Sequence, residues 1–127
     1  MRLPDGTEAG VLGGRLRTGL DLYVNLRPIK LYPNVPTALA NRRPGQIDWV
    51  MVRENTEGLY ASRGNGVVAN SGQAATDTLM ITRLGAERII RYAFDEARRR
   101  NRQKRVACVD KSNVLRSFAF FRRIFTE

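Results

Sequence analysis

The chain has 127 residues, about the length of one domain, which is enough to bury roughly two thirds of the surface that the unfolded chain exposes. Hydrophobic residues make up 43% of the sequence and charged residues 27%, a balance that excludes a disordered or collagen-like chain. Histidine is absent and Cys108 is the only cysteine, which excludes an internal disulfide, a histidine-dependent catalytic triad and a Cys/His metal site. No apolar run approaches the roughly 20 residues of a membrane span, and residues 1–6 lack the apolar stretch of a secretory signal. We therefore expect a cytoplasmic protein without a membrane partner.

The formal net charge is +10, from 22 lysines and arginines against 12 acidic residues, and this excess raises nucleic acid as a partner. The densest basic cluster consists of Arg98, Arg99, Arg100, Arg102, Lys104 and Arg105. Two other interpretations compete with nucleic-acid binding. The cluster can be the end of a helix, where cations suit the C-terminal dipole, or part of a fragment whose acidic counterpart lies elsewhere. The basic-patch criterion alone does not make nucleic acid the favoured partner.

The first half of the chain predicts a helix and two extended segments. A helix is predicted within residues 1–22, although each interior glycine there costs about 1 kcal/mol relative to alanine. Residues 23–32 predict an extended segment that ends at two prolines, and a loop around residues 41–45 follows. Residues 47–52 form a near-continuous apolar run of strand length, as expected for a strand that is covered on both faces.

The middle of the chain predicts a hairpin. Residues 59–61 and 67–69 flank the turn-forming residues 62–66, and residues 78–82 predict a further short strand. Residues 64–69 also match the dinucleotide pattern G-x-G-x-x-A, but that pattern needs a preceding strand and a following helix. Because turn-forming residues follow it instead, we interpret the motif as a hairpin tip. The short strands of this region form no unit able to bury its own apolar face, so we expect an arm that pairs with a second chain.

The last third of the chain predicts helix, strand and helix. Apolar residues recur at helical spacing in residues 83–100, at Ala86, Ile89, Ile90, Ala93 and Ala97. Residues 106–109 predict a buried strand, and the apolar residues of 114–125 predict a closing helix. The alternation of strands and helices predicts an α/β architecture with some parallel pairing. Ligands collect at the carboxyl ends of strands in such sheets, so we expect chemistry after Val52 and Val109, where polar residues follow.

Three arginines are candidates for binding an acid. Arg17, Arg27 and Arg53 each lie in or beside apolar sequence, where a purely solvated charge has little reason to be. Guanidinium groups match carboxylates bidentately and stay charged, so three converging arginines would suit a di- or tricarboxylic acid. The alternative is that, among 19 arginines, some fall beside apolar residues by chance.

Two further residues are candidates for proton transfer. Lys111 follows an apolar run, where desolvation could lower the pKa of its ammonium group toward that of a general base; the alternative is a surface lysine. Tyr60 could supply a phenolic proton, although a tyrosine in a hairpin more often serves packing. A metal site would need clustered carboxylates, and Glu127 is the only acidic residue after Asp110.

Three segments occur in a characteristic order: LRTGLDLYVNLRPIKLYP at residues 16–33, VRENTEGLYAS at 52–62 and CVDKSNVLRS at 108–117. In order and spacing they resemble the β-decarboxylating dehydrogenases, the family of isopropylmalate, isocitrate and tartrate/D-malate dehydrogenases. The resemblance implies a partial α/β fold with a mixed sheet, flanking helices and a β-hairpin arm. It also implies that residues 1–22 are the tail end of the first, nucleotide-side domain. Residues 23–127 would then be most of the second, substrate-binding and dimerisation domain.

The resemblance also implies roles for individual residues. In the family, arginines matching Arg17, Arg27 and Arg53 hold the substrate carboxylates. The tyrosine matching Tyr60 assists protonation after carbon dioxide leaves. The lysine matching Lys111 acts in base catalysis at the substrate hydroxyl and reaches into the neighbouring subunit's site.

The implied cofactors are NAD or NADP, which accepts the hydride, and a divalent metal, Mg²⁺ or Mn²⁺, which polarises the hydroxyl and the resulting ketone. The asparagine matching Asn113 lies near the nicotinamide in the family. The implied substrate is a small 2-hydroxy di- or tricarboxylic acid, and the implied active unit is a homodimer.

The sequence departs from the family in three places. It lacks the family's initial Gly-Asp-Gly-Ile-Gly-Pro-like segment, and the metal-binding aspartates and later nucleotide-binding segment that follow the last helix. We therefore expect an internal fragment that is inactive alone. Residues 10–16, in the region that partly sets substrate choice, include glycines that leave space but offer no hydroxyl for a third carboxylate. This favours a malate-type acid with an apolar or small substituent over isocitrate. A basic nucleic-acid-binding module and an inactive dimerisation domain remain the alternatives.

Overall fold

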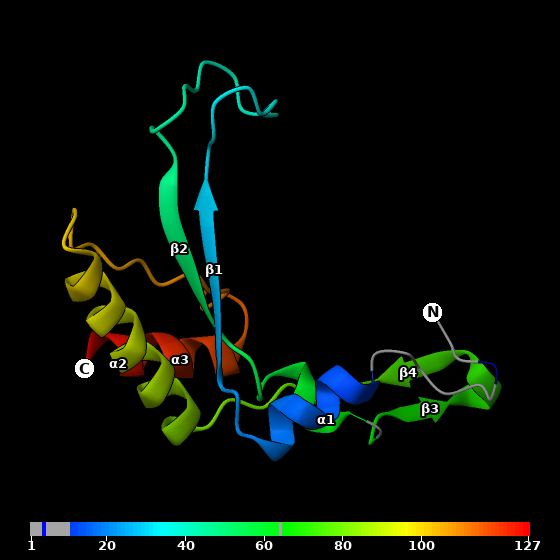
Figure 1. Ribbon diagram of the computed structural model, residues 1–127. Helices are drawn as coiled ribbons and strands as arrows, with labels where there is room; N and C mark the ends of the chain where they lie inside the picture. Colours follow the sequence, from blue (N-terminus) through cyan, green and yellow to red (C-terminus); the bar gives the residue numbers. More distant parts are fainter. Residues whose placement is uncertain (1–3, 5–10, 64) are drawn as a thin grey trace.

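The computed structural model describes residue 4 and residues 11–63 and 65–127 (Figure 1). Its elements, in chain order, are α1 (Val11–Gly19), β1 (Val24–Lys30), β2 (Asp48–Glu54), the 3₁₀ helix η1 (Leu59–Ser62), β3 (Val67–Ala69), the 3₁₀ turn η2 (Asn70–Gly72), β4 (Ala74–Thr76), α2 (Arg83–Arg100) and α3 (Arg116–Thr126). None of the helices described is long and apolar enough to cross a membrane.

Strands β1 and β2 form one antiparallel ladder, which a long loop over residues 31–47 closes at its far end (Figure 1). The register pairs Val24 with Glu54 at one end and Lys30 with Asp48 at the other. Because side chains alternate across a strand, Val52 and Glu54 share the face toward α2, and Arg53 lies on the opposite face. The ladder therefore presents one face to the helix and leaves the other open.

The hydrophobic core lies between the two long helices and the ladder. Its buried members are Ala86, Ile89 and Ile90 of α2 and Ile124 of α3. Helix α2 has the bounds that its apolar spacing predicts. It begins after the N-cap Thr82, whose hydroxyl accepts a hydrogen bond from the Gly85 amide at 3.0 Å.

The predicted hairpin is wrong in its pairing. Residues 59–62 form the 3₁₀ helix η1, and β3 pairs with β4 instead (Figure 1). The physical reason is the turn at 70–72, where Asn70, Ser71 and Gly72 all adopt left-handed conformations and reverse the chain there. The expected strand at 78–82 is also wrong, because only Met80 pairs, in a single bridge with Gly58.

Three further expectations about the sheet are corrected. Residues 106–109 pair with no strand among the described residues, and Val109 is 89% exposed. Strand β2 is not covered on both faces, since Trp49 is 46% exposed. Both ladders are antiparallel, so the parallel pairing does not occur in the described part of the chain. The two apolar runs, 47–52 and 106–109, lack a neighbouring strand or layer that would cover them.

Candidate functional site

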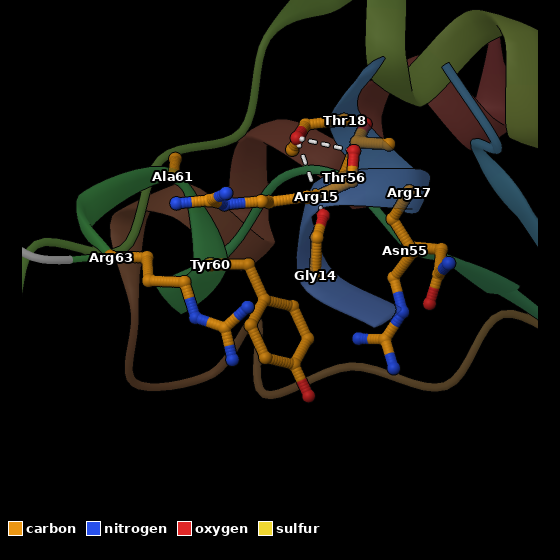
Figure 2. Close-up of a pocket in the computed structure, with 9 residues that line it drawn as sticks. All are labelled: Gly14, Arg15, Arg17, Thr18, Asn55, Thr56, Tyr60, Ala61 and Arg63. Atoms are coloured by element: carbon orange, nitrogen blue, oxygen red, sulfur yellow. Dashed lines mark hydrogen bonds between the residues drawn. The ribbon is translucent and has the colours of Figure 1, made fainter. Parts of the chain in front are cut away.

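A cavity of about 390 Å³ opens between α1, the turn after β2, and η1 (Figure 2). It is lined by Gly14, Arg15, Arg17, Thr18, Asn55, Thr56, Tyr60, Ala61 and Arg63. Gly14, Arg17 and Thr18 lie three and four residues apart in α1, the spacing that brings helical side chains to one face. Among the residues that the structure describes, no carboxylate contributes to the lining, so this wall is suited to an anion.

Tyr60 lies between two of the predicted arginines. The guanidinium carbon of Arg17 is 5.7 Å from the centre of the Tyr60 ring, and that of Arg53 is 5.1 Å from it. Hydrogen bonding and positive charge from Arg53, with a smaller contribution from Arg17, lower the pKa of the Tyr60 hydroxyl below its usual range. The arrangement can bind carboxylates and hold a phenol that gives up its proton more readily than usual.

A buried asparagine connects the cavity to the ladder. Asn55 donates to the backbone oxygen of Leu22 at 3.1 Å and accepts from the Asn25 side-chain amide at 3.1 Å. Asn25 in turn accepts from Nε of Arg27 at 3.0 Å. Neither Arg27 nor Arg53 is among the residues that line the cavity. Arg27 is joined to the wall through Asn25 and Asn55, and Arg53 contacts the wall at Tyr60.

Arg88 of α2, which does not line the cavity, holds the turn after β2 in place. Its guanidinium donates to Asp21 and Thr56, each at 2.7 Å, and to Glu54 at 3.4 Å. Glu54 also accepts from the backbone amides of Thr56 at 2.9 Å and Glu57 at 2.6 Å. One arginine thus fixes the α1–β1 connection and the end of β2, the two segments between which the cavity forms.

Lys111 and Asn113 lie away from this cavity, exposed in the turn that precedes α3. The same turn is anchored by Asp110, whose side chain is only 1% exposed. Asp110 accepts from Nε of Arg122 at 2.6 Å and from the Ser112 amide at 2.9 Å. The hydrogen bond from Arg122 holds the pKa of Asp110 well below its usual range.

The described residues do not fit the expected metal or dinucleotide. No group of three or more carboxylates and cysteines able to hold a metal ion occurs among them. Residues 67–69 of the G-x-G-x-x-A pattern form β3 and open no helix, so the pattern is not a dinucleotide loop. The hairpin tip expected at this motif is wrong, because the chain reverses at residues 70–72.

About half of the charge of the basic cluster at the end of α2 is balanced within the chain. Four of its six members form ion pairs with three carboxylates: Arg98 with Asp95, Arg99 with Glu96, and Arg100 and Arg102 with Asp48. Fewer of these charges are therefore free to bind a phosphate backbone than the sequence suggests. The geometry therefore favours the converging arginines at Tyr60 over a nucleic-acid interface.

Sequence reasoning missed part of the cavity wall. Asn55 belongs to the polar stretch after Val52 at which chemistry was expected, and Thr18 is one helical turn from Gly14. Arg63 carried no signal, because it lies in a turn-forming stretch that was assigned to the hairpin. Its place in the wall follows from η1, which the local sequence did not predict.

Comparison with known proteins identifies the family. The family model described as isocitrate/isopropylmalate dehydrogenase matches residues 6–127. The chain is 48% identical over 100 residues to the tartrate dehydrogenase/decarboxylase of Pseudomonas putida, covering 78% of this chain and 27% of that protein. It is 52% identical over 102 residues to the 3-isopropylmalate dehydrogenase of Bifidobacterium longum, covering 80% of this chain and 29% of that one.

A solved structure extends the match to the fold. The crystal structure of isocitrate dehydrogenase from Methylococcus capsulatus superimposes with a TM-score of 0.78 at 38% identity, over 99% of this chain and 36% of that one. The partial α/β fold expected from the resemblance is thereby confirmed. The chain spans about a third, or less, of the length of these proteins. It belongs to the isocitrate/isopropylmalate dehydrogenase family.

Proposed function

We propose that the cavity binds the carboxylates of a 2-hydroxy acid. The chain would be part of an enzyme that oxidatively decarboxylates this acid with NAD or NADP. The observation that carries the proposal is the approach of Arg17 and Arg53 to Tyr60, at a cavity wall to which the described part of the chain contributes no carboxylate. The relatives named above act, by their names, on tartrate and on 3-isopropylmalate. A 2-hydroxy acid with a β-carboxylate, of the 3-isopropylmalate or malate/tartrate type, is the substrate class that we assign.

The roles proposed for the cavity residues follow from their chemistry. Arg17 and Arg53 would hold the substrate carboxylates through charge-assisted hydrogen bonds, which fix orientation as well as affinity. Tyr60, whose pKa the same arginines lower, would deliver its phenolic proton to the carbon that loses carbon dioxide. Arg27 would act through Asn25 and Asn55, by keeping the cavity wall in place.

The remaining roles belong to an assembly larger than this chain. Lys111, exposed before α3, would take the hydroxyl proton in the site of a second subunit, and Asn113 would lie near the nicotinamide. NAD or NADP and Mg²⁺ or Mn²⁺ would be held by residues other than those that the structure describes. The active unit would be a homodimer joined by the β3–β4 arm, with residues 1–22 closing the first domain and 23–127 forming most of the second.

The proposal is tested by titrating the chain with D-malate in an isothermal titration calorimeter at low ionic strength. Each charge-assisted hydrogen bond contributes roughly 1.5 to 3 kcal/mol, so we expect Arg17→Ala and Arg53→Ala each to weaken binding by about tenfold or more. The matched control is Arg43→Ala, which removes a guanidinium from the loop at the far end of the ladder (Figure 1). Equal dissociation constants for the wild type, Arg17→Ala and Arg53→Ala would refute the proposal.

A further inference from the structure

Arg63 occupies a space that only a glycine at position 14 leaves open. An added Cβ on Gly14 would overlap Nη1 of Arg63, with the guanidinium carbon at 3.0 Å. The atoms that overlap belong to the guanidinium at the end of the Arg63 side chain. The close contact is therefore between the backbone of α1 at Gly14 and the tip of one arginine. Figure 2 shows Arg63 and Arg17 on opposite sides of Tyr60, with Gly14 between them along the wall.

The backbone of η1 orients Arg63 toward the cavity. The Arg63 amide donates to the carbonyl oxygen of Tyr60 at 3.2 Å, which is the i to i+3 bond of a 3₁₀ helix. Side chains three residues apart eclipse in that helix, so Tyr60 and Arg63 lie on one side of it. The buried Ser62, whose hydroxyl donates to the Leu59 carbonyl at 3.1 Å, anchors the same turn.

The charge of Arg63 is not neutralised within the described part of the chain. Neither it nor Arg15, Arg17 or Arg53 forms an ion pair with a carboxylate among the described residues. Two arginines beside Tyr60 account for the carboxylates that every substrate of the assigned class carries. Arg63 is therefore a further cation, on the wall formed by the start of α1, with no substrate group assigned to it.

We propose that Arg63 determines specificity, by binding an anionic substituent on the carbon that bears the β-carboxylate. The inference rests on the proposed function. It keeps the 2-hydroxy acid with a β-carboxylate and replaces the 3-isopropylmalate or malate/tartrate type by an acid with a third carboxylate. It replaces the expectation of an apolar or small substituent, because the Arg63 guanidinium fills the space beside Gly14, whereas the space beside Gly13 is open. The glycine and the arginine act as a pair, since any side chain at position 14 would force the Arg63 guanidinium to shift from its place on the wall.

A matched series of ligands isolates the substituent. D-malate, 3-isopropylmalate and isocitrate share one 2-hydroxy diacid and differ in carrying hydrogen, isopropyl or carboxymethyl on the adjacent carbon. We expect the wild-type chain to bind isocitrate about tenfold or more tightly than D-malate in calorimetric titrations at low ionic strength. Arg63→Gln should remove this preference, by weakening isocitrate binding about tenfold or more beyond any change in D-malate binding.

Two further variants serve as controls. Gly14→Ala should shift the Arg63 tip without deleting its charge. We expect it to lower the preference for isocitrate, as Arg63→Gln does. Arg43→Gln removes one positive charge from the distant loop and should leave the preference unchanged. Circular dichroism of each variant shows that the helices are retained.

The outcomes separate this inference from the proposed function. Equal affinity of the wild type for isocitrate and D-malate, or an equal loss of both ligands in Arg63→Gln, would overturn the role of Arg63. If Arg17→Ala and Arg53→Ala still weaken D-malate binding in that case, the proposed function stands. Absence of binding by the wild type to all three acids would overturn both.

Discussion

Asp110 shows how one buried carboxylate organises its surroundings. It accepts hydrogen bonds from Arg122, Ser112 and the thiol of Cys108, the last at 3.2 Å. Burial, and then hydrogen bonding to the carboxylate and its negative charge, raise the pKa of Cys108 to about 11. Lys111 lies between Asp110 and Ser112, which these hydrogen bonds anchor. The backbone of Lys111 is held as well, because the Val114 and Leu115 amides both donate to its carbonyl oxygen at 3.0 Å.

Cys108 should therefore react slowly with thiol reagents. At pH 8 a thiol of this pKa is about one thousandth ionised, whereas a free cysteine is roughly one quarter ionised. We expect alkylation by iodoacetamide to be on the order of a hundredfold slower in the folded chain than in the same chain in 8 M urea (about the concentration needed for full unfolding). Asp110→Asn should accelerate the folded-state reaction by removing the adjacent charge. Equal rates in the folded and unfolded chains would contradict the assignment.

At the scale of elements, the sequence predicts those that local spacing specifies and misses those that depend on a turn. The apolar period of residues 83–100 predicts α2 to the residue, because the same side chains that set the period fill the core. The hairpin fails because the left-handed residues of η2 place the reversal after β3, beyond the glycines at 64 and 66. Of the cavity lining, motif order indicated Arg17 and Tyr60, and it also indicated Arg53, which contacts Tyr60. Arg63 needed η1, which no local period specifies.

The small core makes α2 sensitive to single truncations. Ile89 is one of four buried hydrophobic residues that hold α2 and α3 together. We expect Ile89→Ala to lower the free energy of unfolding by about 2 to 5 kcal/mol, through lost burial and the cavity left behind. Leu84→Ala, at a position that is 73% exposed on the same helix, should change it by less than about 0.5 kcal/mol. Urea titrations followed by circular dichroism measure both, and equal midpoints for the two variants would contradict this core assignment.

The whole molecule exposes more surface to solvent than a globular monomer of the same mass does. Its accessible surface is 10166 Å², whereas a globular monomer of 14.4 kDa exposes about 6800 Å². Part of the excess lies on the arm, where every residue of β3 and β4 is exposed (Figure 1). Another part lies on the open face of the ladder, at Trp49 and Met51. A two-stranded ribbon of this kind is only marginally stable in water on its own. We therefore expect the exposed faces of the arm and of the ladder to be covered by other protein surface.

The arm should therefore associate with a second copy of the chain, as the proposed homodimer requires. Pairing would supply neighbours for the edges of β3 and β4 and bury Val67 and Val68, the latter now 70% exposed. We expect sedimentation velocity to show a dimer whose fraction rises with concentration, and Val68→Asp to shift the equilibrium toward monomer by placing a charge in the apolar contact. Leu39→Asp, at a position that is also exposed but in the 31–47 loop, should leave the equilibrium unchanged. Hydrogen exchange reports whether the arm is ordered in each sample. A chain that stays monomeric at high concentration while the β3–β4 amides remain protected would show that the arm folds without a partner, and the dimer proposal would then be wrong.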